Sequence, residues 1–310
     1  MIINILILLV GLSLLLYSAD QMIESADLIA KKFSLPPILI GLTIIAFGTS
    51  APELVVTIIA ASKTIPANDA IVGNVIGSNI ANILLVLGVS SFFFKIELSN
   101  IRYKDNIYLF IVTAYFSTLF YFVDEINIYH TAGFILLVIL FLNQLRNYDE
   151  VQRNVGVDKF SNLTYLKLII SFVGIFIGGK IFLDSSLNIF TSLGFEQTII
   201  GISILAIGTS LPELATVVIS YIRKKGSIGI GNVIGSNIMN ILFVFLPGVL
   251  IVQSRNLNFF IPENINIHLY ILILSTLIML VLSLLKFSIS KFTSLIFIIF
   301  YVIYISSVII

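Results

Sequence analysis

Apolar residues dominate the chain in long stretches that are separated by short charged or turn-rich breaks. Ten such stretches are present, near residues 2–26, 36–62, 68–94, 105–123, 128–145, 164–190, 196–222, 227–250, 266–285 and 290–309. A helix that crosses the hydrocarbon core of a bilayer needs about 20 mostly apolar residues. The pattern therefore predicts an all-α polytopic membrane protein with ten transmembrane helices.

Four of these stretches are interrupted in the middle by polar or helix-breaking residues. Stretches 36–62 and 196–222 contain Pro together with polar residues, and stretches 68–94 and 227–250 contain Gly, Asn and Ser. Irregular backbone at membrane depth is tolerated only where it is buried in protein or lines a water-filled cavity. We therefore expect broken helices in these four stretches, around a polar site.

The interrupted stretches carry a sequence that occurs twice. Residues 40–55 (IGLTIIAFGTSAPELV) and 200–215 (IGISILAIGTSLPELA) are identical at 10 of 16 positions, and residues 73–84 (GNVIGSNIANIL) and 231–242 (GNVIGSNIMNIL) at 11 of 12. The copies lie 160 and 158 residues apart, so the repeating unit contains five spans. An odd number of spans inserts the second copy upside down, and inverted repeats of this kind are typical of secondary transporters.

The repeat divides the chain into two halves of five helices each. We predict a first repeat at residues 1–146, a short cytoplasmic connection at 147–163 and a second, inverted repeat at 164–310. Lys and Arg concentrate on the cytoplasmic side of membrane proteins. With the N-terminus outside, 14 of the 17 Lys and Arg residues fall in the inside connections. This bias predicts that both termini are extracytoplasmic.

Composition narrows the possible functions further. Residues of the AVILMFWYC class make up 58% of the chain and charged residues 11%, whereas about 25% of a soluble domain is charged, so a soluble enzyme is excluded. The net charge of +1 supplies no field for nucleic acid. The absence of cysteine excludes thiolate metal sites. We expect the lipid bilayer as the partner, with no cofactor and no obligate protein partner.

Two acidic residues, Glu53 and Glu213, fall in the middle of predicted spans and occupy the same place in the two repeats. A charged side chain inside a membrane is costly, and it marks an ion pathway by default. An alternative is a helix-capping box, because Ser50 and Ser210 stand three residues earlier and each Glu follows a Pro. The two interpretations are compatible if the helix breaks at Gly48 and Gly208 and a new helix begins near Ser50 and Ser210. The backbone carbonyl oxygens freed at the break would then face the same cation as the carboxylate.

The second motif places further oxygen donors on one helical face. Polar residues recur at i, i+4 and i+8 in each copy, namely Asn74, Ser78 and Asn82, and Asn232, Ser236 and Asn240. Helix–helix packing is the alternative role, since the motif contains small-xxx-small glycine pairs and Asn and Ser bond across helices. We predict oxygen-donor roles for the last two positions of each triplet. Asn79 and Asn237 lie about 100° away around the helix, and their role stays open.

All of these donor atoms are oxygens, and the two histidines, His130 and His268, lie at predicted span ends. Oxygen ligands favour Ca²⁺, Na⁺ or Mg²⁺ over Zn²⁺ or Cu⁺. Mg²⁺ prefers to keep several waters, which disfavours a cage made wholly of protein. Elsewhere, Asp20, Glu24 and Asp27 at the inner end of the first span are expected to form a solvated face.

The segments GTSAPE at residues 48–53 and GTSLPE at residues 208–213, each followed about 20 residues later by GNVIGSN, resemble the α-repeats of the calcium/cation antiporter superfamily. They are most similar to those of prokaryotic sodium/calcium exchangers. The resemblance implies alternating access in the prokaryotic inner membrane, with Ca²⁺ moving against several Na⁺. It also implies a set of metal ligands: Glu53, Glu213, Thr49, Thr209, Ser50, Ser210, the carbonyls of Ala46 and Ala206, Ser78, Ser236, Asn82 and Asn240.

Residue 240 departs from the pattern of many relatives, including potassium-dependent ones, which carry Asp at the matching place. We therefore expect K⁺-independent exchange. With two carboxylates in the site, one Ca²⁺ would neutralise it and a third Na⁺ would leave one positive charge, so the exchange is expected to be electrogenic. Proton/Ca²⁺ exchange is the alternative. A passive cation channel, and an intramembrane hydrolase using the G-x-S of residues 48–50, are disfavoured because channels rarely need inverted repeats and a serine nucleophile needs a base.

Overall fold

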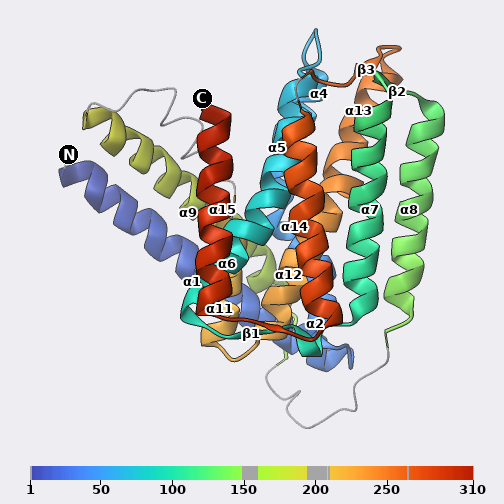
Figure 1. The fold of residues 1–310 in the computed structure, drawn as a ribbon. Helices are drawn as coiled ribbons and strands as arrows, with labels where there is room; N and C mark the ends of the chain where they lie inside the picture. The colour runs from blue at the N-terminus through green and yellow to red at the C-terminus, as the bar shows by residue number, and fades with distance from the viewer. Residues whose placement is uncertain (1, 149–159, 194–207, 209, 264, 310) are drawn as a thin grey trace.

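The structure is a computed structural model that describes residues 2–148, 160–193, 208, 210–263 and 265–309. It is built almost entirely of helices (Figure 1). The first half contains α1 (Ile2–Lys32), α2 (Pro37–Ile40), η1 (Gly41–Ile45), α3 (Ala46–Thr49), α4 (Ala51–Ser62), α5 (Asn68–Ala81), η2 (Asn82–Val86), α6 (Leu87–Phe93), β1 (Ile96–Glu97), η3 (Leu98–Asn100), α7 (Tyr103–Phe122), β2 (Glu125–Ile126) and α8 (Ile128–Arg146). The second half contains α9 (Leu163–Ser192), α11 (Leu211–Ile222), α12 (Gly226–Met239), η5 (Asn240–Phe245), α13 (Leu246–Ser254), β3 (Phe259–Phe260), α14 (Asn266–Leu284), β4 (Ser288–Ile289) and α15 (Lys291–Ile309). The all-α prediction is confirmed.

Most of the described helices coincide with predicted apolar stretches to within a few residues. The exceptions are α1, which runs to Lys32 instead of residue 26, and the short 3-10 helix η3, which lies between two stretches. Six of the described helices are long and apolar enough to cross a membrane, and the bent pair Pro37–Thr49 and Ala51–Ser62 would make a seventh. Two further apolar helices, Leu211–Ile222 and Lys291–Ser306, are shorter. The total of ten spans therefore stays a prediction.

The two long helices α1 and α9 form a tilted pair at one side of the molecule (Figure 1). Their backbones touch because glycines face the partner helix. A Cβ atom at Gly178 would lie 2.6 Å from the Leu15 nitrogen, and one at Gly11 would lie 2.7 Å from the Phe182 nitrogen. Small residues permit this close approach of helices, so the pair packs without large interlocking side chains along this line.

The remaining helices surround a larger apolar core. Part of it is a buried aromatic cluster in which the ring centroid of Phe245 in η5 lies 5.0–5.5 Å from four other rings, those of Phe116, Phe120, Phe134 and Phe259. Edge-to-face aromatic pairs at such distances contribute beyond their buried area. The cluster therefore joins α7, α8 and β3 to the π-helical turn η5.

Two short antiparallel ladders connect loops from the two halves of the chain. Strand β1 pairs with β4, placing Ile96 opposite Ile289, and β2 pairs with β3, placing Ile126 opposite Phe259. The ladders lie at opposite ends of the helices (Figure 1). Each ladder thus fastens a loop of the first half to a loop of the second by main-chain hydrogen bonds.

The expected solvated face on α1 is wrong for Asp27, which is buried between Lys225 at 2.8 Å and Lys31 at 2.9 Å. Asp20 stays partly exposed and forms an ion pair with Arg223 at 2.5 Å. Glu24 is exposed, as expected. The difference arises because the turn before α12 brings two cations from the second half over α1, a contact that the sequence spacing does not show.

Candidate ion-binding site

The site begins at a bend between α3 and α4, where the helix direction changes by 45°. The bend lies at Ser50, which has φ −84° and ψ 5°. Pro52 has no backbone N–H, so the Gly48 carbonyl loses its usual helical partner. The break was predicted at Gly48, but Gly48 lies within α3, where a Cβ would collide with the Phe172 ring. That glycine permits contact with α9.

The capping-box interpretation does not describe these serines. Neither Ser50 nor Ser210 makes a side-chain cap hydrogen bond, and among the described residues neither buried hydroxyl has a partner. An N-cap residue usually has extended dihedrals. At Ser50 the backbone ladder instead continues, since its N–H donates to the Ala46 carbonyl at 3.0 Å and its carbonyl accepts from Leu54 at 3.1 Å. Both hydroxyls are therefore available to a ligand.

The carboxylates of Glu53 and Glu213 lie one turn beyond the serines, and each residue is 1% exposed. Oε1 of Glu53 accepts a hydrogen bond from Ser78 at 3.3 Å, whereas Oε2 has no partner among the described residues, and neither do the two carboxylate oxygens of Glu213. Neither carboxylate forms an ion pair with a described Lys or Arg. A bound cation would supply the missing counter-charge.

Two hydrogen-bond networks hold the bend in place. The Asn74 amide donates to the Glu53 carbonyl at 2.9 Å and to Thr57 Oγ1 at 3.3 Å. The Thr49 hydroxyl lies 3.0 Å from Asn232 Oδ1, 3.2 Å from Ser236 Oγ and 3.3 Å from the Ala46 carbonyl. The second network links the bend in the first half directly to α12 in the second.

Two amide pairs cross between the halves. The Asn82 amide donates to Asn237 Oδ1 at 3.2 Å, and the Asn240 amide donates to Asn79 Oδ1 at 3.1 Å. Asn79 and Asn237, whose role the sequence left open, are therefore part of the site. The π-helical turns η2 and η5 begin at Asn82 and Asn240, and such turns are frequent at functional sites. Within the described chain, the Oδ1 atoms of Asn82 and Asn240 have no hydrogen-bond partner.

Backbone contact positions α12 against α2 and η1, the helical segments that precede the bend. A Cβ at Gly231 would lie 2.5 Å from the Ile38 carbonyl oxygen, and one at Gly235 would lie 2.5 Å from that of Leu42. This agrees with the packing role predicted for these glycines. No described atom outside its own helix backbone lies within 4 Å of a Cβ built on Gly73 or Gly77. The segment that the repeat places opposite them, near residues 198–202, lies outside the described residues, so the packing role stays a prediction in the first copy.

The contacts leave a set of buried oxygen atoms without hydrogen-bond partners among the described residues: Ser50 Oγ, Glu53 Oε2, Asn82 Oδ1, Ser210 Oγ, Glu213 Oε1 and Oε2, and Asn240 Oδ1. Each such atom costs about 1–3 kcal/mol when it stays unpaired. Ca²⁺ takes 6–8 oxygen ligands, so the set fits a hard cation. Among the described residues, no group of three or more His, Cys, Asp or Glu side chains could hold a metal ion. The charge of the candidate site therefore comes from two carboxylates, and its other oxygens are neutral.

The remaining predicted ligands divide into two groups. Thr49, Ser78, Ser236 and the Ala46 carbonyl lie at the site but already take part in hydrogen bonds. Ala206 and Thr209 lie outside the described residues. His130 takes part in a capping box at the start of α8, where its backbone N–H donates to the Asn127 side chain at 3.2 Å, so it is not available as a ligand at depth.

Comparison with known proteins places this geometry in context. The sequence model of the family described as sodium/calcium exchanger protein matches residues 3–144 and 163–310. The sodium/calcium exchanger MaX1 of Methanosarcina acetivorans is 32% identical over 87% of this chain and 91% of its own, and the putative antiporter CaxA of Alkalimonas amylolytica is 32% identical over 81% and 82%. The solved structure of the sodium-calcium exchanger NCX_Mj has a TM-score of 0.82 and 28% identity, and covers 99% of both chains.

Proposed function

The chain belongs to the sodium/calcium exchanger protein family, and we propose that it exchanges Ca²⁺ for Na⁺ across a prokaryotic cell membrane by alternating access. The observation that carries the proposal is the set of buried, unpartnered oxygens around Glu53 and Glu213. A site with two carboxylates and neutral hydroxyl and amide oxygens can take a dehydrated Ca²⁺ or Na⁺ ions in turn. Similarity to named exchangers supports the choice of these two ions.

The proposed central ligands are Glu53 and Glu213, which supply the charge. The neutral ligands come from the two motifs, namely Thr49, Ser50, Ser78, Asn82, Ser210, Ser236, Asn240 and the Ala46 carbonyl, together with Thr209 and Ala206 by the repeat. Hydrogen bonds to Asn79 and Asn237 orient the amides of Asn240 and Asn82. The free Oδ1 atoms of these two amides are thereby held in fixed positions.

The proposed arrangement is two inverted five-helix repeats, residues 1–146 and 164–310, joined by a cytoplasmic connection at 147–163. Three features support it. The repeat relates β1 to β3 and β4 to β2, so the ladder β1–β4 of one repeat corresponds to the ladder β3–β2 of the other. The two ladders lie at opposite ends of the helices (Figure 1), as an inverted repeat requires. The crossed amide pairs join equivalent motifs of the two halves. The free ends of α1 and α15 lie toward the same end of the molecule (Figure 1), as an even number of spans requires.

The transport is proposed to be electrogenic and independent of K⁺. Two ionised carboxylates give the empty site two negative charges, so one Ca²⁺ neutralises it and three Na⁺ leave one positive charge. Asn240 offers a neutral oxygen where an acid would hold a further cation. Proton/Ca²⁺ exchange is the competing function, since the free oxygens of Glu213 could also accept a proton.

The test is Ca²⁺ uptake into proteoliposomes under a Na⁺, K⁺ or H⁺ gradient imposed one at a time. We expect uptake with Na⁺ alone, no requirement for K⁺, and loss of uptake in Glu53→Gln and Glu213→Gln. The matched control is Glu97→Gln, which removes an exposed carboxylate in β1. Retention of more than a tenth of the wild-type flux, a loss below about 1.4 kcal/mol, by both site variants would refute the ligand assignment. Uptake driven by H⁺ alone would support the competing function.

A further inference from the structure

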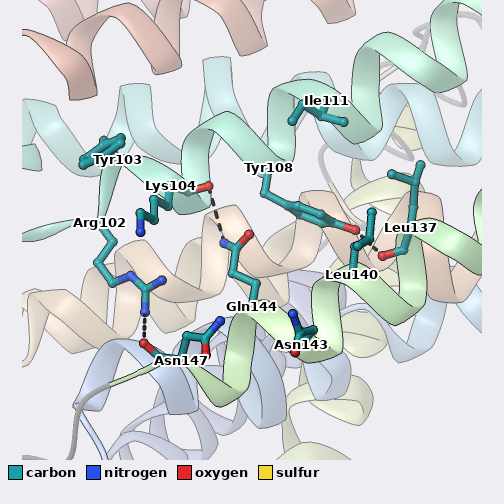
Figure 2. A pocket seen from close by; sticks show the side chains of 10 residues that line it. All are labelled: Arg102, Tyr103, Lys104, Tyr108, Ile111, Leu137, Leu140, Asn143, Gln144 and Asn147. Carbon is teal, nitrogen blue, oxygen red and sulfur yellow. Dashed lines mark hydrogen bonds between the residues drawn. The ribbon is translucent and has the colours of Figure 1, made fainter.

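A cavity of about 620 Å³ lies between the start of α7 and the end of α8 (Figure 2), and none of its lining residues belongs to the candidate ion site. Its lining changes character along the helices. Arg102, Lys104 and Asn147 line the end nearest the loops, and Tyr108, Ile111 and Leu140 line the part further along the helices. The cavity therefore combines a basic, amide-rich mouth with an apolar interior.

Neighbouring contacts hold the basic mouth in shape. Nη1 of Arg102 donates to the Asn147 carbonyl at 3.0 Å, and the guanidinium carbon lies 4.0 Å from the centre of the Tyr148 ring. The Tyr148 hydroxyl donates in turn to the buried carboxylate of Asp105. Burial and the adjacent Asp105 raise the pKa of Tyr148, so the hydroxyl keeps the proton that it donates. These contacts orient the guanidinium before any ligand arrives.

The mouth carries positive charge that the described chain does not neutralise by direct pairing. Arg102 and Lys104 form no salt bridge with a described carboxylate, whereas Asp105 is buried behind the cavity and bonded to Gln144 at 2.8 Å. Arg146, in the last turn of α8, adds a third cation at the same end. The single bond of Arg102 to Asn147 uses one of five guanidinium donors, so the others can bind an anion.

The apolar part is open toward the side of the helix bundle. Ile111 and Leu140 are each 46% exposed, and in a membrane protein apolar side chains exposed on a spanning helix contact lipid. Ile111 follows Lys104 by seven residues, which corresponds to about 10 Å along a helix. A ligand that fits both parts has an anionic group at one end and an apolar chain at the other, about 10 Å further into the bilayer.

We propose that this cavity binds an anionic glycerophospholipid, with its phosphate at Arg102 and Lys104 and an acyl chain against Ile111 and Leu140. Clusters of basic residues at the membrane surface recognise anionic lipids, and Arg is suited to phosphate by its planar set of donors. The site is independent of what the protein transports, because it uses no residue of the candidate ion site.

The experiment measures lipid retained by the full-length protein in native mass spectrometry, after purification in detergent and addition of phosphatidylglycerol or phosphatidylcholine. Phosphatidylglycerol should bind preferentially to the wild type. The double variant Arg102→Gln/Lys104→Gln should bind it about 30-fold more weakly, roughly fivefold per basic side chain. The control Lys286→Gln/Lys291→Gln removes two cations that do not line the cavity, in the loop after α14 and the first turn of α15. It should leave binding unchanged.

A second variant distinguishes a lipid from a free anion. Leu140→Trp should fill the apolar part and weaken phosphatidylglycerol binding while leaving both cations in place, and its melting temperature reports whether it folds. Inorganic phosphate is the probe for a soluble anion. Equal retention of the two lipids by the wild type would overturn the proposal. Unchanged binding in the Arg102/Lys104 variant, or phosphate binding without phosphatidylglycerol binding, would overturn it as well.

Discussion

Asn240→Asp would add a third negative charge to the candidate ion site with little change in shape. In the wild type the Asn240 amide donates to Asn79 Oδ1 at 3.1 Å, and the Asn79 amide nitrogen has no partner among the described residues. Rotation of the Asn79 amide would turn that nitrogen toward the new carboxylate and restore the hydrogen bond. The variant is therefore expected to fold and to bind cations.

The added charge should move the voltage-sensitive step from one half of the transport cycle to the other. On the proposed stoichiometry, two ionised carboxylates would make the Ca²⁺-loaded site of the wild type neutral, whereas three Na⁺ would leave one positive charge. In the variant the Ca²⁺-loaded site would carry one negative charge, and three Na⁺ would neutralise it. Moving one charge through the whole field costs about 2.3 kcal/mol per 100 mV, which changes a rate by about 50-fold.

Isotope exchange at equal ion concentrations isolates the two halves of the cycle. In proteoliposomes held at a series of voltages, Ca²⁺–Ca²⁺ exchange by the wild type should not depend on voltage, while Na⁺–Na⁺ exchange should. Asn240→Asp should reverse this pattern. The control is Asn258→Asp, which makes the same chemical change at an exposed position. The charge assignment is refuted if wild-type Ca²⁺–Ca²⁺ exchange depends on voltage, or if the variant keeps the wild-type pattern.

Two further predictions concern topology and packing. A cysteine that replaces the exposed Lys63 should react with an impermeant reagent from outside, and one that replaces the exposed Lys224 only from inside; labelling of both from the same side would contradict the inverted repeat. Gly235→Ala should lower the melting temperature, at a cost of about 1–3 kcal/mol, because its Cβ would meet the Leu42 carbonyl at 2.5 Å. An unchanged melting temperature in Gly235→Ala would refute the packing argument.

The pattern of apolar stretches and the internal sequence repeat were sufficient to predict a helical fold. They also identified the motifs whose side chains meet at the candidate ion site. The stretch predicted at 68–94 corresponds closely to α5, η2 and α6, which run continuously from Asn68 to Phe93. The restart of a helix near Ser50 was also predicted, because Pro52 marks a first helical turn. These features depend on local sequence, and local sequence is what the periodicity of apolar residues reports.

Contacts between the halves could not be predicted in the same way. A regular helix places Asn79 about 100° from the face that Ser78 and Asn82 share, so the sequence assigned it to a different face. In the structure Asn79 and Asn82 each bond to the other half, at Asn240 and Asn237, because α5 and α12 meet there and π-helical turns follow. The ion pairs of Asp20 and Asp27 with Arg223 and Lys225 were missed for a similar reason, since these partners lie 203 and 198 residues away in the chain.

The crossed amide pairs restrict which residues the two repeats can carry at the paired positions. Each pair joins non-equivalent positions, so Asn79 depends on residue 240 and Asn82 on residue 237, while the repeat relates 79 to 237 and 82 to 240. An amide can donate or accept, so Asn at one position tolerates Asn or Asp at the other. Two carboxylates in one pair would have no donor between them. An acid at position 240 is therefore compatible with Asn79 but not with a second ionised acid at position 79, so each half restricts the residues that the other can carry at these crossed positions.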